Sequence, residues 1–155
     1  MCIRDRHTND APSTITRLQN MGTPDYLISA ATQLVVAQRL ARKNCKDCRV
    51  PDDDVNPKVL QDLGFSAEQA SRVKAIKGKG CTKCNNTGYK GRQGIYEILV
   101  VTKPLKEAIL RQATTPELRE IGVKEGFQTM QDMGRRLIAS GELNFREFER
   151  VLSGE

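Results

Sequence analysis

The chain contains two Cys-x-x-Cys pairs, and this pattern constrains its fold more strongly than any other feature of the 155 residues. Cys45 is paired in this way with Cys48, and Cys81 with Cys84. Two residues between cysteines allow a tight turn to direct both sulfur atoms toward one point, so two such turns supply four thiolates at the corners of a tetrahedron. This is the geometry of structural zinc sites, and the pattern predicts Zn²⁺ bound by these four cysteines.

Other chemistries of paired cysteines fit the sequence less well. Disulfide bonds are not expected, because the N-terminus lacks the apolar segment of an export signal and cytosolic thiols stay reduced. A redox Cys-x-x-Cys requires only one pair, whereas an iron–sulfur cluster or a metal-free form stays open as an alternative. Zinc held by four thiolates has no position left for a substrate, so the predicted role is structural. Cys2 has no partner at a matching spacing and is interpreted as a bystander.

The net charge of +6 is concentrated around the cysteines. The windows 39–49 and 72–92 hold nearly half of the 25 basic residues and a single acid, Asp47. Zinc with four thiolates carries a net charge of about −2, which nearby lysine and arginine side chains offset. The alternative is a surface for an acidic partner such as phospholipid head groups, an acidic protein or nucleic acid, which leaves peripheral membrane association open.

The pattern of apolar residues and turn formers predicts a mixed α/β fold. The segment 34–40 favours a strand over a continuation of the preceding helix, and 94–101 also indicates a strand, so that the zinc site lies between two strands with a small helical insertion. Helix starts are predicted at Asp10-Ala11-Pro12, Thr23-Pro24, Asn56-Pro57, Ser66, Thr102-Lys103-Pro104, Thr115-Pro116 and Asn144. Apolar positions at helical spacing in the C-terminal third are interpreted as core: Leu105, Ile109, Leu110, Met130, Met133, Leu137, Ile138, Phe145, Phe148, Val151 and Leu152.

Catalytic motifs are missing from the sequence. It contains no Gly-x-x-x-x-Gly-Lys-Ser/Thr loop, no Gly-x-Ser-x-Gly, no His-Glu-x-x-His and no Gly-x-Gly-x-x-Gly. The only histidine is His7, so a histidine-based catalytic dyad would have to use that residue. The 155 residues alone are therefore not expected to form an independent enzyme, and they should not hydrolyse ATP by themselves.

Three stretches of the sequence resemble one family, the secretion ATPases that assemble type IV pili or drive type II secretion. The resemblance extends from His7 to the C-terminus. The stretches are His7-Thr8-Asn9-Asp10-Ala11 with Ile15-Thr16-Arg17-Leu18; Val36-Ala37-Gln38-Arg39-Leu40-Ala41-Arg42 leading to Cys45 and Cys48; and Cys81-x-x-Cys84-x-x-Thr87-Gly88-Tyr89-x-Gly91-Arg92-x-Gly94-Ile95-Tyr96-Glu97.

The resemblance implies a division of the chain. Residues 7–43 would be the end of a RecA-like ATPase core, 44–98 an inserted four-cysteine zinc subdomain and 99–155 a helical C-terminal subdomain. Residues 1–6 do not resemble the apolar strand that precedes His-Thr-Asn in the family, and we interpret them as an artefactual leader. The P-loop, the Walker B acid and the acidic Asp box of the family would lie upstream of His7, so the sequence resembles a C-terminal fragment.

The resemblance also implies roles for individual residues and partners. His7 would belong to the histidine box near the nucleotide phosphates, and Arg17 and Arg39 would lie near the nucleotide or a subunit boundary. The intact protein would bind ATP and Mg²⁺, form a homo-hexamer and act at the cytoplasmic face of the bacterial inner membrane on a platform protein. The pilus branch is favoured over the secretion branch.

The alternative function is that of a stand-alone zinc ribbon that binds nucleic acid through the basic residues near the cysteines. The charge and the predicted metal agree with it. It leaves the run at 81–97 and the His-Thr-Asn start unexplained, and the basic windows lack the interleaved aromatic residues that stack on bases.

Overall fold

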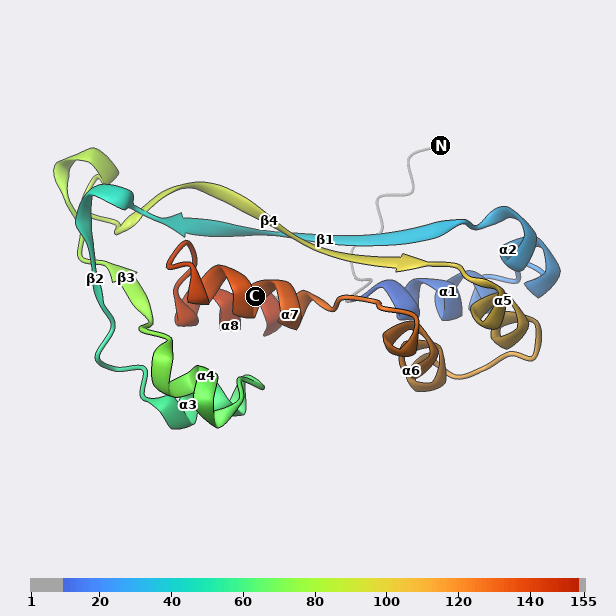
Figure 1. The fold of residues 1–155 in the computed structure, drawn as a ribbon. Coiled ribbons are helices and arrows are strands. Elements are labelled where there is room, and N and C mark those ends of the chain that lie inside the picture. The colour runs from blue at the N-terminus through green and yellow to red at the C-terminus, as the bar shows by residue number, and fades with distance from the viewer. Residues whose placement is uncertain (1–9, 154–155) are drawn as a thin grey trace. The chain divides into compact units, whose positions relative to one another are not determined.

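The computed structural model describes residues 10–153 and has a mixed α/β fold (Figure 1). In chain order its elements are α1 (Ala11–Asn20), α2 (Asp25–Ala31), β1 (Leu34–Asn44), β2 (Arg49–Pro51), α3 (Pro57–Asp62), α4 (Ala67–Arg72), β3 (Ile76–Gly78), β4 (Tyr89–Val100), α5 (Lys103–Leu110), α6 (Thr115–Lys124), α7 (Met130–Ala139) and α8 (Phe145–Ser153). The predicted α/β class is confirmed.

The described residues form two compact units. The first comprises residues 10–38 and 96–130, and the second comprises 39–95 and 131–153. Strands β1 and β4 pair in a two-stranded sheet and contribute residues to both units. Both strands were predicted from the sequence, but each extends further toward the cysteines than the segments 34–40 and 94–101 indicated.

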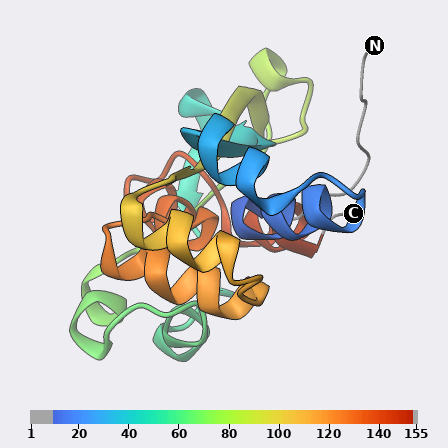
Figure 2. The same cartoon turned by 90° about the vertical axis from the view of Figure 1, so that its right-hand side faces the viewer.

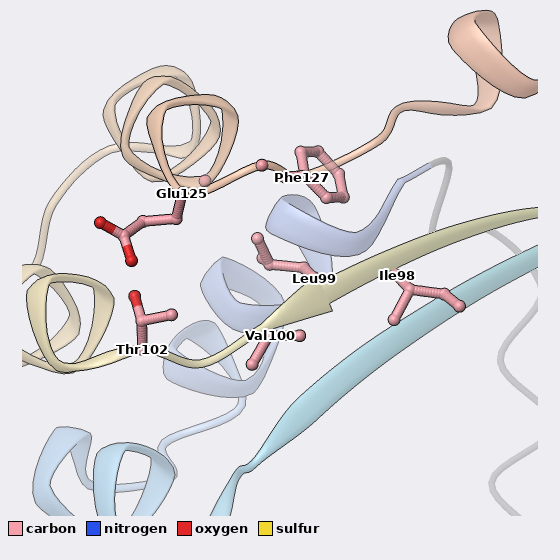
Figure 3. Close-up of a pocket in the computed structure, with 8 residues that line it drawn as sticks. Ile98, Leu99, Val100, Thr102, Glu125 and Phe127 are labelled. Carbon is pink, nitrogen blue, oxygen red and sulfur yellow. The ribbon is translucent and has the colours of Figure 1, made fainter.

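Strand β4 buries one side-chain face in the manner of an amphipathic strand. Ile95 and Leu99 are buried, whereas Tyr96, Ile98 and Val100 alternate with them and are exposed. Figure 3 shows Leu99 directed toward Phe127, and Ile98 and Val100 directed to the other side of the strand. Glu97 occupies an inward position between Ile95 and Leu99 and is only 2% exposed.

Four helices form the first unit together with the ends of the strands. Helix α1 packs on α2 and α6, and α5 packs on α2 and α6 (Figure 2). Asp10 caps α1 by accepting the Ser13 N–H at 2.8 Å, as the Asp10-Ala11-Pro12 pattern predicted. The core consists of aliphatic side chains from all four helices and β4, including Ile15, Ile28, Leu99, Leu105, Ile109 and Leu118.

The second unit contains a short antiparallel pair, β2 with β3, in which Arg49 is opposite Gly78 and Pro51 is opposite Ile76. Helices α3 and α4 lie between β2 and β3 in the sequence, and they pack against each other (Figure 1). Helix α4 begins at the predicted start, where Ser66 and Gln69 form a capping box. It ends at Arg72, and residues 76–78 then pair with β2.

Helices α7 and α8 complete the second unit by close packing. Phe148 is fully buried, and a Cβ atom placed on Gly134 would lie 1.9 Å from Phe148 Cε2. The glycine therefore permits the ring to contact the α7 backbone. Among the predicted core positions of these helices, Met130, Ile138, Phe148 and Val151 are buried, and Met133, Leu137, Phe145 and Leu152 are half-buried.

One helix start differs in detail from the prediction. Pro24 occupies the N-cap position of α2 instead of the first helical position, and no side chain caps this helix. Across residues 10–153, no helix combines the length and apolar character needed to cross a membrane.

Candidate metal centre

Each Cys-x-x-Cys pair folds as a short turn next to a long strand. Cys45 directly follows β1 and precedes a 3₁₀ turn at Lys46–Cys48. Cys81 precedes a matching 3₁₀ turn at Thr82–Cys84, and β4 begins at Tyr89. The two turns are joined through the backbone, because the Cys45 N–H donates to the Gly88 carbonyl at 2.8 Å.

The four sulfur atoms form a compact cluster. All lie within 4.8 Å of one another, and three of the Sγ–Sγ separations are 3.9 Å for Cys45–Cys81, 3.9 Å for Cys48–Cys84 and 3.7 Å for Cys81–Cys84. A tetrahedral zinc ion with Zn–S bonds of about 2.3 Å requires sulfur atoms about 3.8 Å apart. The donor set and its spacing therefore fit a tetrahedral metal ion, and the predicted grouping of these four residues is confirmed as a cluster.

Backbone N–H groups point at the sulfur atoms and favour their ionised form. Cys84 Sγ accepts from the Cys81 N–H at 3.2 Å and from the Gly88 N–H at 3.3 Å, and Cys48 Sγ accepts from the Gly80 N–H at 3.3 Å. Burial alone would raise the pKa of the Cys84 thiol, but these N–H groups and the neighbouring thiols lower it to about 6. Burial raises the pKa of Cys48 to about 12, with further increases from the hydrogen bonds among the thiols. Because the four thiols lie this close together, their protons belong to the cluster as a whole rather than to single sulfur atoms.

Two glycines allow the backbones of the cluster to approach closely. A Cβ atom on Gly78 would lie 2.0 Å from the Gly88 carbonyl oxygen, and one on Gly88 would lie 2.4 Å from the Gly78 carbonyl oxygen. Gly88 also has a φ of +77°, which a residue with a side chain adopts only with strain. Gly78 and Gly88 lie on either side of the second cysteine turn, so this contact closes the loop that carries Cys81 and Cys84.

The basic residues around the cluster are mostly exposed. Lys83 in the second turn forms an ion pair of 2.7 Å with Asp47 in the first, so the two turns are also joined through side chains. The hydrogen bond from Lys83 lowers the pKa of Asp47. Lys46, Lys79, Lys90 and Arg92 are exposed, which agrees with the interpretation as a solvated face that offsets the charge of the thiolates.

A polar network links the second cysteine turn to α8. The Arg42 guanidinium lies over the Tyr89 ring at 4.2 Å, and the Tyr89 hydroxyl accepts from Asn144 Nδ2 at 2.8 Å. Asn144 caps α8 by accepting the Glu147 N–H at 2.7 Å, as predicted. The buried Glu147 carboxylate accepts from Arg42 at 2.6 Å and from Arg150 at 2.7 Å.

The sequence predicted a helix start at Asn144, three residues before Glu147, but not the pairing of this glutamate with two arginines. The available signal was a basic residue three positions later, at Arg150. The pairing with Arg42, which lies on β1, is a tertiary contact without a local pattern in the sequence.

The other predicted site residues lie away from the cysteines or outside the described residues. His7 and Cys2 fall in residues 1–9, which the structure does not describe. Arg17 has an exposed side chain on α1. Arg39 lies on β1, and its guanidinium donates to the carbonyl oxygens of Val151 and, at 3.1 Å, Leu152 at the end of α8. The nucleotide or subunit role of Arg17 and Arg39 stays a prediction.

Two pockets away from the cysteines differ in size and in exposure to solvent. In the first unit, a cavity of about 50 Å³ lies beside Thr102, Glu125 and Phe127 (Figure 3). The Thr102 hydroxyl is buried there without a hydrogen-bond partner, and a cavity of this size holds water rather than a nucleotide. In the second unit, an open depression of about 520 Å³ lies beside Asp52, Val55, Pro57, Val73 and Lys74.

Comparison with known proteins identifies relatives across nearly the whole chain. The family model described as "Type II/IV secretion system protein" matches residues 1–150. The type IV pilus assembly ATPase PilB of Myxococcus xanthus is 36% identical over 141 residues, covering 91% of this chain and 25% of the relative. PilB of Thermus thermophilus is 40% identical over 134 residues, covering 86% of this chain and 15% of the relative. The type II secretion system protein HxcR of Pseudomonas aeruginosa is 36% identical over 145 residues, covering 94% of this chain and 27% of the relative.

Each match covers most of this chain but only a small part of the relative. The chain spans about a quarter of the length of most of these curated relatives, and less of the one from Thermus thermophilus. Pilus ATPases and secretion ATPases match it at similar identity, so the comparisons do not separate the two branches. The chain belongs to the type II/IV secretion system protein family.

Proposed function

We propose that this chain forms the C-terminal part of a cytoplasmic hexameric ATPase that powers type IV pilus assembly, or type II secretion, through an inner-membrane platform protein. The observation that carries the proposal is the family match over residues 1–150 together with relatives that are pilus and secretion ATPases. In this proposal residues 7–43 end a RecA-like core, 44–98 form the metal-binding subdomain and 99–155 form a helical C-terminal subdomain.

The metal in this proposal is zinc with a structural role. Cys45, Cys48, Cys81 and Cys84 would hold it through four thiolates, and the sulfur spacing supports that ligand set. A bound zinc ion would neutralise charge on the thiolates and cross-link the two cysteine turns. The chain's own residues position the cluster through the Gly78–Gly88 backbone contact and the N–H groups directed at sulfur.

The nucleotide chemistry of the proposal belongs to the intact protein. No P-loop occurs among the 155 residues, so ATP and Mg²⁺ would be bound with residues of the upstream ATPase core. His7 would contribute the histidine box near the phosphates, and Arg17 and Arg39 would lie near the nucleotide or a subunit boundary.

The first test is a long sequencing read across the source locus, upstream of the codon for His7. We expect an open reading frame that encodes a P-loop and a Walker B acid. The purified product of that frame should hydrolyse ATP and sediment as a hexamer, whereas residues 7–155 alone should do neither. If the codon for Met1 is instead the true start codon and no ATPase core is encoded in frame upstream of it, the motor function is refuted for this gene.

The metal is tested separately by elemental analysis of the purified protein. We expect about one zinc per chain, and a loss of the bound zinc in Cys84→Ser, since metal binding in such sites is coupled to folding. Cys2→Ser is the matched control and should retain the zinc. Iron and acid-labile sulfide in stoichiometric amounts would instead identify an iron–sulfur cluster.

A further inference from the structure

Glu97 is a buried carboxylate that binds the first residues of two helices. Its Oε1 atom accepts the Ala11 N–H at 2.9 Å, where α1 begins, and its Oε2 atom accepts the Met130 N–H at 3.2 Å, where α7 begins. Ala11 and Met130 lie far apart in the sequence, so the side chain joins two segments that have no local connection. All three residues belong to the first unit.

The geometry requires a group with two acceptor oxygens. A glutamine of the same shape has one carbonyl oxygen and one NH₂ group, and the NH₂ group would face a backbone N–H donor on one of the two helices. A carboxylate is also the favoured charge at the N-termini of helices, where the N–H groups point outward. The two hydrogen bonds therefore exist together only with an ionised carboxyl group.

Keeping a carboxylate at this position is unfavourable for folding by itself. Burial raises the pKa of Glu97, whereas the Ala11 and Met130 N–H groups oppose that shift and nearby Asp10 adds to it. Arg119 lowers the pKa, but it pairs directly with Asp10 and not with Glu97. A glutamine would avoid the desolvation of the charge but would lose one of the two hydrogen bonds, so the two effects on stability oppose each other.

The two helix starts have particular places in the chain. Ala11 follows the His7-Thr8-Asn9 segment with only Asp10 between them. Met130 is the residue at which the chain leaves the first unit, because residues from Gln131 onward belong to the second. A single side chain on β4 thus binds the first residue of α1 and the first residue of α7.

We propose that Glu97 is a positioning residue that ties the start of α1 to the start of α7, so that a displacement of one helix start is transmitted to the other. This inference rests on the proposed ATPase function, since it assigns Glu97 to the coupling of the nucleotide-facing segment with the C-terminal helices. Glu97 itself contacts neither nucleotide nor metal in this proposal.

The test compares Glu97→Gln with Glu117→Gln in the intact protein that carries this chain. Glu117 is a matched control, because it also caps a helix start but uses one oxygen, Oε2, for both of its bonds to Thr114. A glutamine can reproduce that arrangement with its carbonyl oxygen. Ala11→Pro is the second variant, since it removes only the N–H donor at the first helical position, where proline is tolerated.

Two readouts are measured on each protein: the steady-state kinetics of ATP hydrolysis, and hydrogen–deuterium exchange of peptides that cover residues 10–15 and 128–133. For Glu97→Gln and Ala11→Pro we expect kcat to fall at least about tenfold with KM for ATP within about twofold, as small misplacements of a site do. Exchange should increase at a helix start, while the hexamer is retained. Glu117→Gln should match the unmodified protein in both readouts.

The outcomes separate this inference from the proposed function. Unchanged exchange at both helix starts in Glu97→Gln overturns the clamp, and an unchanged kcat in both clamp variants overturns its role in coupling while the ATPase function stands. Loss of the hexamer with equal losses in all kinetic parameters in both variants would assign Glu97 a merely structural role and would also overturn the proposal. An unmodified intact protein without ATPase activity refutes the proposed function, and the exchange data then still decide whether the clamp exists.

Discussion

Replacing Glu147 by glutamine should destabilise the second unit in a manner that depends on pH. The Glu147 side chain is fully buried, whereas the side chains of its partners Arg42 and Arg150 remain 50% and 41% exposed. Loss of the carboxylate therefore leaves both arginines accessible to water, and the effect of the variant reports mainly the stabilisation of the Glu147 charge.

The magnitude follows from the pKa of the group. Burial alone would raise the pKa of Glu147, but hydrogen bonds from Arg150 and Arg42 lower it from 4.5 to about 2. The difference corresponds to about 3 kcal/mol of folding free energy. Since the folded-state pKa is the lower one, this stabilisation is present above pH 4.5 and is lost as the pH falls toward 2. About half of it should remain near pH 3.

The assay is urea denaturation of the unmodified chain, Glu147→Gln and Glu149→Gln at pH 7 and pH 3. Acid also protonates the cysteines and releases any bound metal, but it does so in all three proteins, so the difference between them isolates Glu147. We expect Glu147→Gln to be less stable by about 3 kcal/mol at pH 7, and by about half of that at pH 3. Glu149 is exposed on the same helix, and its variant should match the unmodified chain at both values. A difference that is absent at pH 7, or equal at both pH values, would refute the reasoning.

Four further variants test the packing and the hydrogen bonds of the second unit by thermal or urea denaturation. Phe148→Ala should cost about 3–5 kcal/mol because it leaves a cavity in the core, and Gly134→Ala should cost about 1–3 kcal/mol because its Cβ would overlap the same ring; equal stability in either variant contradicts the packing described. Tyr89→Phe should cost about 1 kcal/mol by removing the acceptor of Asn144, and no loss would mean that the bond makes no net contribution. Arg39→Ala should lower stability by about 1 kcal/mol, because it removes the donor of the carbonyl oxygens at the end of α8. Unchanged stability would show that water satisfies these carbonyl groups equally well.

The cysteine cluster and several helix starts could be predicted from the sequence because each is determined over a few residues. A Cys-x-x-Cys spacing directs two sulfurs to one point, and the caps at Asp10, Ser66 and Asn144 depend on side chains within three positions of their targets. The paired strands β2 and β3 were not predicted, since each has only three residues and shows no measurable alternation. Their pairing joins segments that are separated in the sequence by α3 and α4, which is a property of the tertiary fold.

The sequence of β4 does not indicate which of its two faces is buried. Tyr96, Ile98 and Val100 form an uninterrupted apolar set, whereas the alternate set contains Glu97. Binary patterning would therefore bury Tyr96, Ile98 and Val100, yet these three are exposed and Glu97 is buried with Leu99. The backbone N–H groups of Ala11 and Met130 make the reversed orientation favourable, and neither is near Glu97 in the sequence.

Two of the buried carboxylates in residues 10–153, Glu147 and Glu97, compensate their charge in opposite ways. Glu147 is paired with two arginines, which lower its pKa, so its ionisation stabilises the fold. Glu97 is held by backbone N–H groups, and burial raises its pKa, so its ionisation opposes folding. A variant that removes the charge should therefore destabilise the chain at position 147, while at position 97 the lost hydrogen bond and the avoided desolvation act against each other. The carboxylate of Glu147 is therefore explained by its two arginine partners, and that of Glu97 by the two helix starts whose N–H groups it accepts.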